Sequence, residues 1–239
     1  MEERLQKVIA ESGYTSRRKA EDLILNNKVT VNGKVVNTLG TKVSKKDEIM
    51  VDGTLISREE KVYFLLNKPR GVVCTASDEF KRKTVVDLIE TDKRIFPVGR
   101  LDYDTTGLIL LTNDGELTNI LTHPKSNVLK TYLVKLDRLI DIEDFYKIKD
   151  GIDIDGQKVI VKRLKIKKND KSKENSFIEI SIVEGRNHIV KRLFKELGYN
   201  VDKLTRIYYA GLNLGTLLSG EYRTLTKKEV SELYSYRRK

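Results

Sequence analysis

The sequence predicts an α+β protein with two domains, because short strand patterns and separate helical patterns follow one another without an internal repeat. A polar, turn-rich stretch at residues 45–61 interrupts the apolar patterns. We therefore expect one domain at residues 1–60 and a second at residues 61–239, with the linker near residues 57–62. The 239 residues are enough to form a substantial hydrophobic core.

The first domain is predicted to contain two short helices and a β-hairpin. Apolar side chains recur at helical spacing in residues 5–9, and a second helical pattern starts at residue 20 after a cap at Ser16. Strand-like residues then flank Asn32-Gly33, a pair that favours a two-residue turn with positive φ at both positions. The order helix-helix-hairpin follows from these patterns.

The second domain is predicted to contain buried strands that are joined by irregular loops. Residues 108–111 are too short for a helix and lie between Gly107 and the turn at residues 113–115, so they form an interior strand. Further strands are expected at residues 62–66, 130–135 and 177–182, helices at residues 84–89, 116–121 and after a capping box at Thr226, and a hairpin tip at residues 167–173.

The charge of the chain favours a polyanionic partner. It has 46 Lys and Arg against 35 Asp and Glu, a formal net charge of +11, and nearly all of this excess lies in residues 61–239. Nucleic acid is the stronger candidate, because no stretch approaches ~20 apolar residues and the first residues are not a signal peptide. One cysteine cannot form an internal disulfide, which fits a reducing cytoplasm. We expect a cytoplasmic monomer.

Three cations occupy the first turn of the second predicted helix: Arg17, Arg18 and Lys19. The helix dipole makes cations unfavourable there by ~0.3–1 kcal/mol each. Residues that are unfavourable for local structure are typical of a functional site. The helix N-terminus together with these cations would hold a phosphate. The alternative is an ordinary solvated charged face.

Asp102 is the strongest candidate for a reactive side chain. It lies in a polar, turn-forming cluster directly before the interior strand, where a carboxylate would be rigid and exposed. The residues alone also allow Asp102 or Asp104 simply to tie down its own turn. A metal-dependent nuclease using Asp102, Asp104, Asp114 and Glu116 is a further alternative. With two histidines, one cysteine and no complete calcium loop, we otherwise expect no metal site.

A third informative segment, residues 184–194, is predicted to lead into an amphipathic helix. Its apolar side chains form one face, while His188, Lys191, Arg192 and Lys195 share the opposite face.

These segments together resemble the pseudouridine synthases that act on ribosomal RNA. The sequence Gly-Arg-Leu-Asp at residues 99–102 matches the family's G-R-L-D, and residues 104–108 match D-T-x-G-L. Asn-Lys-Pro-Arg-Gly at residues 67–71 matches N-K-P-x-G, and Lys-Thr-Tyr at residues 130–132 is similar to the tyrosine motif. The segment from Gly185 resembles G-R-x-x-Q-V-[RK]-R-M, with isoleucine in place of the usual glutamine.

The first domain resembles the small RNA-binding domain shared by a small-subunit ribosomal protein and bacterial tyrosyl-tRNA synthetases. That likeness rests on Arg-Leu-Gln-Lys at the start, Ser-Arg-Arg-Lys-Ala-Glu midway and Val-Asn-Gly-Lys after it. The resemblance implies RNA contacts from Arg4, Arg17, Arg18, Lys19, Asn32 and Lys34.

For the second domain, the resemblance implies a mixed, largely antiparallel sheet and a set of site residues. Asp102 would be the nucleophile, Lys191 its ion-pair partner, and Tyr132 the ring that stacks on the target base. By its pattern alone Tyr132 is a strand-core tyrosine, and His188 is a surface or RNA-facing residue. Arg100 would hold a flanking phosphate or the space that the base vacates, and Arg186 would contact substrate.

The implied activity is isomerisation of a ribosomal RNA uridine to pseudouridine. No cofactor is expected, because the product is an isomer of the substrate. Attack on the anomeric carbon, addition to uracil carbon 6 and a glycal route all remain open. We favour the large-subunit 23S RNA, with 16S RNA as the second candidate, in a pre-ribosomal particle or as free RNA. The alternative from another class is a catalytically silent RNA-binding factor for ribosome assembly.

Overall fold

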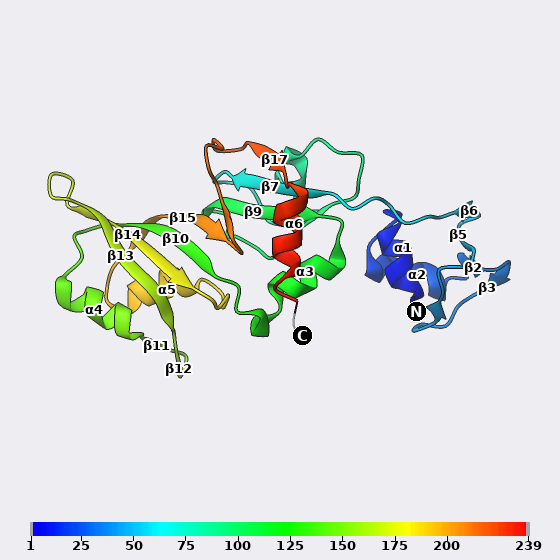
Figure 1. Cartoon of the computed structure of the whole chain (residues 1–239), viewed down its shortest axis with the longest axis horizontal. Helices are drawn as coiled ribbons and strands as arrows, with labels where there is room; N and C mark the ends of the chain where they lie inside the picture. The colour runs from blue at the N-terminus through cyan, green and yellow to red at the C-terminus, as the bar shows by residue number, and fades with distance from the viewer. Residues whose placement is uncertain (1, 238–239) are drawn as a thin grey trace. The chain divides into compact units, whose positions relative to one another are not determined.

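The computed structural model describes residues 2–237 and divides into two compact units (Figure 1). The first unit runs up to residue 62 and also takes in residues 91–95 and 113–115. The second unit contains residues 63–90, 96–112 and those from 116 onward. Within residues 2–237, no helix is both long and apolar enough to cross a membrane.

The first unit has the helix-helix-hairpin order that the sequence predicts. The Ser16 side chain accepts a hydrogen bond from the backbone amide of Lys19, so it caps the second helix as expected. Asn32 and Gly33 have φ values of 51° and 77°, which is the backbone conformation of the predicted hairpin turn. The elements are β1 (Glu3–Arg4), α1 (Leu5–Glu11), α2 (Arg17–Leu25), β2 (Val29–Val31), β3 (Lys34–Val35), β4 (Lys42–Val43), β5 (Ile49–Val51) and β6 (Thr54–Leu55).

A nine-stranded mixed sheet forms the second unit. Its order is β13-β14-β10-β15-β9-β7-β17, with β16 beside β15 and β8 beside β9. All pairs are antiparallel except β15 and β9, which run parallel. The α+β class and the largely antiparallel sheet are thus confirmed. The strands are β7 (Tyr63–Lys68), β8 (Phe96–Pro97), β9 (Thr106–Thr112), β10 (Lys130–Leu136), β13 (Val161–Asp170), β14 (Asn175–Ile182), β15 (Val201–Tyr209), β16 (Leu212–Asn213) and β17 (Tyr222–Thr224).

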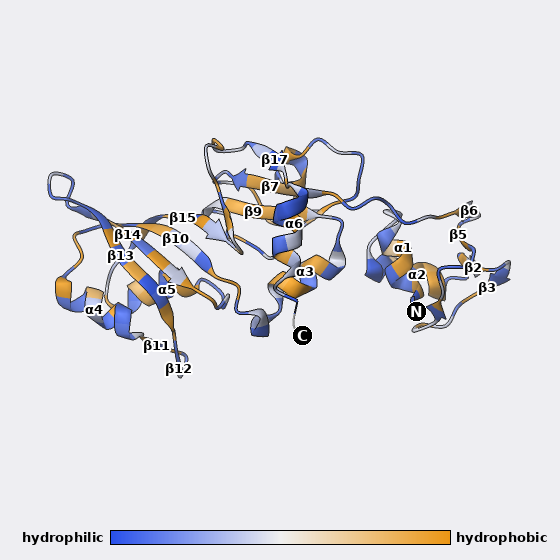
Figure 2. Cartoon of the chain, in the orientation of Figure 1, coloured by the Kyte–Doolittle hydropathy of each residue, from blue (hydrophilic) through white to orange (hydrophobic). Residues whose placement is uncertain are grey.

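Helices pack on this sheet and complete its cores. Leu117 and Leu121 of α3 and Leu233 of α6 are buried with Leu65 of β7 and Leu108 of β9, which makes β9 the predicted interior strand. Figure 2 shows the hydrophobic colour along β9 and the hydrophilic loop between β13 and β14. The helices are α3 (Gly115–Thr122), α4 (Ile142–Asp150), α5 (Ile189–Glu196) and α6 (Lys227–Tyr234), and β11 (Asp153–Ile154) pairs with β12 (Gln157–Lys158).

Gly107 allows β9 and β15 to approach each other closely. Its φ is 106°, and a Cβ atom there would lie 2.2 Å from the carbonyl oxygen of Arg206. Only glycine fits both conditions without a backbone shift. The loop that precedes β9 is therefore held against β15, and this junction carries the site described below.

The structure contradicts one sequence-based expectation for the second unit, a helix at residues 84–89, and corrects the bounds of another, the hairpin tip at residues 167–173. Residues 84–89 contain only a 3-10 turn at Val86–Leu88, because Thr84 donates to the Asp87 carboxylate and bridges to Val73 instead of starting an α-helix. The strand β13 continues to Asp170, so the hairpin tip lies at residues 171–174. The end of this edge strand was not predicted because its lysines resemble a polar loop. Most of its charged side chains are exposed, as is usual for an edge strand.

Candidate active site

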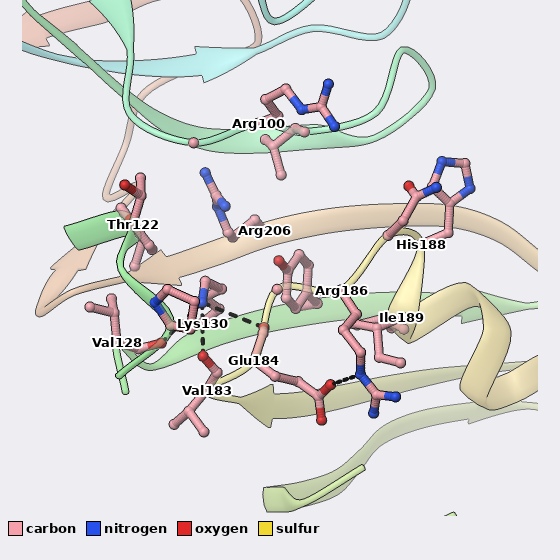
Figure 3. A pocket seen from close by; sticks show the side chains of 18 of the residues that line it. Arg100, Thr122, Val128, Lys130, Val183, Glu184, Arg186, His188, Ile189 and Arg206 are labelled. Carbon is pink, nitrogen blue, oxygen red and sulfur yellow. Dashed lines mark hydrogen bonds and ion pairs between the residues drawn. The ribbon is translucent and has the colours of Figure 1, made fainter. Parts of the chain in front are cut away.

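A cavity of about 620 Å³ opens in the second unit where the loop before β9 faces β10 and β15. Its walls come from several separate parts of the chain, and Figure 3 shows how their side chains converge. The lining includes residues 98–102, 121–124, 183–190 and side chains of β10 and β15. Most of these segments lie far apart in the sequence, so the cavity forms only when the sheet brings them together.

Asp102 lies at this cavity on the loop between Gly99 and Thr105. Its side chain is 30% exposed, and the hydroxyl of Thr105 donates to its Oδ2 atom over 3.4 Å. The amide of Thr105 also donates to the backbone carbonyl of Asp102, which closes the turn. The carboxylate is therefore both oriented by its own loop and open to a ligand in the cavity.

Lys191 on α5 pairs with two carboxylates of this loop. Its Nζ atom lies 3.1 Å from Oδ2 of Asp102 and 2.6 Å from Oδ1 of Asp104. The hydrogen bond from Lys191 lowers the pKa of Asp104 below its ordinary value. The resemblance had suggested a pair with Asp102 alone. The structure shows one ammonium group shared between two carboxylates, with the shorter distance to Asp104.

His188 also lies beside Asp102. Its Nε2 atom is 3.4 Å from Oδ1 of Asp102, and its backbone has a φ of 52° at the start of α5. The side chain is half exposed, as expected for a surface residue, but it faces the candidate nucleophile as well. The sequence placed it on the cationic helix face, whereas in the structure it is the N-cap residue of α5 and lies beside the loop of Asp102.

A fully buried lysine supports the loop from below. Lys68, at the end of β7, donates to the carbonyl oxygens of Thr105 over 2.8 Å, Pro69 over 3.0 Å and Tyr103 over 3.4 Å. Burial lowers the pKa of Lys68. Because Tyr103 and Thr105 follow Asp102 closely in the chain, these bonds fix the backbone that carries it. In the sequence, Lys68 stands out only as part of a family motif, and this supporting role was not predicted.

The floor of the cavity is formed by Tyr132 and Arg206, which are cross-strand neighbours on β10 and β15. Tyr132 is 9% exposed, so it is a strand-core residue that also lines the cavity. Arg206 is 3% exposed and donates through Nε to the carbonyl of Leu108 over 2.8 Å. Beside them, Lys130 donates to the carbonyl of Val183 over 2.9 Å. Burial, followed by the charge of Arg206, lowers the pKa of Lys130 to about 8.

Arg206 and Lys130 were not recognised as site residues from the sequence. Both strands carry other charged residues, so no signal in the sequence singles out these two cations.

The two arginines expected to bind substrate differ in their surroundings. Arg100 is exposed at the cavity. The guanidinium of Arg186 donates to the carbonyls of Ile154 over 2.8 Å and Gln157 over 3.3 Å, and it pairs with Glu184. Figure 3 shows it directed toward Glu184 and away from Arg100. Arg186 therefore anchors the β11–β12 hairpin at the cavity rim with most of its donors in use.

The candidate RNA-binding residues of the first unit are exposed, but one of them has another use. The amide group of Asn32 donates to Asp47 over 2.9 Å, and its oxygen accepts from the backbone of Glu48 over 2.9 Å. Asn32 thus ties its hairpin to the neighbouring turn. The other members are exposed cations, namely Arg4, Arg17, Arg18, Lys19 and Lys34.

The carboxylates of the nuclease alternative have cationic partners. Asp102 and Asp104 share Lys191, Asp114 lies 3.0 Å from Lys61, and Glu116 pairs with Arg237. Across residues 2–237, no group of three His, Cys, Asp or Glu side chains could hold a metal ion.

Comparisons with known proteins agree with this architecture. A family model described as RNA pseudouridylate synthase matches residues 62–196, and one described as S4 domain matches residues 3–49. The chain is 50% identical over 232 residues to the ribosomal large subunit pseudouridine synthase B of Bacillus subtilis (strain 168), covering 97% of this chain and 95% of that protein. It is 38% identical over 235 residues to the dual-specificity RNA pseudouridine synthase RluF of Escherichia coli (strain K12), covering 97% and 78% of the two chains.

A solved structure of a pseudouridylate synthase also has a similar fold. A crystal structure of pseudouridylate synthase has a TM-score of 0.67 and 36% sequence identity, covering 96% of this chain and 99% of that one. The S4 match covers the helix-helix-hairpin unit. The synthase match covers the segments that bring Asp102 and Tyr132 to one cavity and pair Asp102 with Lys191. The resemblance inferred from the motifs is thus confirmed, and the chain belongs to the RNA pseudouridylate synthase family.

Proposed function

We propose that this enzyme converts a uridine of ribosomal RNA to pseudouridine, with Asp102 as the nucleophile. The observation that supports this best is the position of Asp102. It is an oriented, partly exposed carboxylate paired with Lys191, at a cavity whose floor contains Tyr132. The large-subunit RNA is the favoured target, because the Bacillus subtilis relative carries that name. The reaction needs no cofactor and takes place in the cytoplasm, on free RNA or a pre-ribosomal particle.

Entry of the base requires that it leave the RNA stack. Flipping a base out costs a few kcal/mol, which stacking and phosphate contacts offset. Tyr132 supplies the stacking ring within the cavity. Arg100 is exposed, so it contacts a flanking phosphate or fills the position that the base leaves.

Asp102 must be ionised to act as a nucleophile. The ammonium of Lys191 pairs with Asp102 and helps to orient its carboxylate at the cavity. During the reaction the bond between ribose C1′ and uracil N1 breaks, and uracil C5 bonds to C1′ instead. One proton leaves C5 and one is gained at N1, so the atoms balance without a further reactant.

The test compares two neighbouring aspartates that share Lys191. Asp102→Asn should abolish pseudouridine formation in a purified assay while leaving RNA affinity and thermal stability nearly unchanged, because an amide cannot act as the nucleophile. The matched variant Asp104→Asn keeps the nucleophile and should retain measurable turnover.

Mapping pseudouridine in ribosomal RNA from cells with and without the gene identifies the target. Appreciable product from Asp102→Asn would end the assignment of the nucleophile. RNA binding without any product from the wild type would favour the silent assembly factor. RNA cleavage that magnesium restores after chelation would favour the nuclease.

A further inference from the structure

Arg206 is a buried cation with an unused donor. Within residues 2–237, its Nη2 atom is inaccessible to solvent and has no hydrogen-bond partner, and no carboxylate forms an ion pair with the guanidinium. A charged donor that is buried without an acceptor costs more free energy than a neutral donor in the same position. Such an exception in a native protein calls for an explanation, and a catalytic role is one of the explanations that account for it.

The orientation of this donor is fixed by the surrounding strands. Nε of Arg206 donates to the carbonyl of Leu108, and the guanidinium carbon lies 4.6 Å from the ring centroid of Tyr209. Figure 3 shows the side chain projecting from β15 into the space below the segment of Arg100. Lys130 adds a second positive charge nearby, but its ammonium donates to the carbonyls of Val128, Val183 and Glu184. Of these two described cations, Arg206 is the one with a donor that has no partner.

We propose that Arg206 is a catalytic residue whose guanidinium donates a hydrogen bond to a carbonyl oxygen of the target uracil. The proposal rests on the proposed function, since it requires that a uracil occupy this cavity. Tyr132, the expected stacking partner of the base, is the cross-strand neighbour of Arg206, so a base on its ring lies within reach of the guanidinium. A carbonyl oxygen is the acceptor that uracil presents along its edge.

A backbone phosphate is a poorer ligand for this donor. Arg206 is 3% exposed and lies at the cavity floor, whereas the RNA backbone must remain outside with its solvated charges. Arg100 is exposed at the cavity and is available for a phosphate.

The symmetry of uracil lets one donor serve both halves of the reaction. A half-turn about the axis through N3 and C6 exchanges N1 with C5 and also exchanges the C2 and C4 carbonyls. The position held by one carbonyl oxygen before the rotation is thus held by the other after it. When the C1′–N1 bond breaks, its electron pair passes to the ring and the two carbonyl oxygens share the negative charge. A fixed cationic donor stabilises this charge as an oxyanion hole does.

The first test uses the wild-type enzyme and three RNAs that carry uridine, 2-thiouridine or 4-thiouridine at the mapped target. Sulfur is a weaker acceptor than oxygen, so both thio substrates should react at least about tenfold more slowly in single turnover. Full rates with both would overturn the proposal, and this measurement does not depend on any variant folding.

The second test asks whether the thio effect passes through Arg206. Arg206→Lys and Arg206→Gln should lower kcat by about 10²–10³-fold, the range for loss of one oxyanion-hole donor, with RNA Kd changed by less than about threefold. In both variants the penalty for thio substitution should shrink toward one. Arg163→Gln removes an exposed cation of β13 outside the cavity and should behave like the wild type in both measurements.

Three outcomes separate the two proposals. If the wild type converts the uridine RNA and Asp102→Asn does not, the proposed function stands. If the thio substrates still react more slowly than the uridine RNA in the Arg206 variants, by the same factor as in the wild type, only the role of Arg206 is overturned. The lower kcat of these variants would then come from loss of the hydrogen bond between Arg206 and the Leu108 carbonyl. Absence of product from the wild type would instead refute the proposed function.

Discussion

Removal of the Lys191 ammonium should reduce chemistry far more than RNA binding. At an effective dielectric constant of about 20, a charge 3.1 Å from Asp102 corresponds to about 5 kcal/mol of gross attraction. The side chains of Lys191 and Asp102 are 21% and 30% exposed. Screening and desolvation therefore reduce this attraction, and we expect the activation free energy to rise by about 2–4 kcal/mol when the ammonium is removed. Lys191→Met should therefore lower kcat by about 30- to 1000-fold.

Loss of the shared cation also changes the second carboxylate. The hydrogen bond from Lys191 lowers the pKa of Asp104, so this pKa should return toward its ordinary value in Lys191→Met. The side chain of Asp104 should then bind a proton at a higher pH than in the wild type, which carboxyl NMR signals measure directly. Lys191→Arg keeps the charge with altered geometry and should retain partial turnover.

Lys195 provides a matched control for this experiment. It lies one turn further along α5 and is exposed, and it does not line the cavity. Single-turnover rates and RNA Kd values should be measured for Lys191→Met and Lys195→Met. Lys195→Met should weaken binding at most and leave the single-turnover rate unchanged. Equal losses of rate in both variants would show that the basic face acts collectively and would refute the specific role of Lys191.

Two further predictions concern stability and RNA affinity. The pKa of Lys130 is lowered from 10.5 to about 8, so the native state binds fewer protons than the unfolded state between these values. Urea denaturation should therefore show the wild type gaining about 1–2 kcal/mol relative to Lys130→Met between pH 8 and 10, and a constant difference would contradict this placement of Lys130. Replacing Arg17, Arg18 and Lys19 together by Ala should weaken RNA binding and flatten its salt dependence by up to ~0.9 for each phosphate that these side chains neutralise. Thermal stability should stay equal or rise by tenths of a kcal/mol, whereas an unchanged salt slope would identify these cations as a solvated face.

Two residues outside the cavity, Lys68 and Gly107, hold the loop of Asp102 in place. Lys68 occupies the interior beneath the loop, and Gly107 lets β9 approach β15 directly after it. Neither residue reaches the cavity as a lining side chain. Both act through the backbone, so substitutions there should displace the carboxylate without touching substrate.

Local patterns in the sequence were sufficient for many elements of the fold. The Ser16 cap, the Asn32-Gly33 turn and the Thr226 capping box each depend on contacts within a few residues, and all three are present. The interior strand β9 was recognisable because its apolar run is short and bounded by turn residues. Residues 84–89 were assigned wrongly because a non-local bridge to Val73 overrides their helical pattern.

By itself, the sequence determined the α+β class, the order of the two RNA-related modules and the motif residues Asp102, Tyr132 and Lys191. The sequence does not show how close these residues lie in space, since Asp102 and Lys191 are 89 positions apart in the chain. Only the tertiary structure showed that Lys191 is shared with Asp104, that His188 faces Asp102, that Lys68 supports their loop, and that Arg206 lies buried with a free donor. These facts depend on which strands become neighbours across the sheet and on how burial changes the environment of a charge, and both are properties of non-local packing.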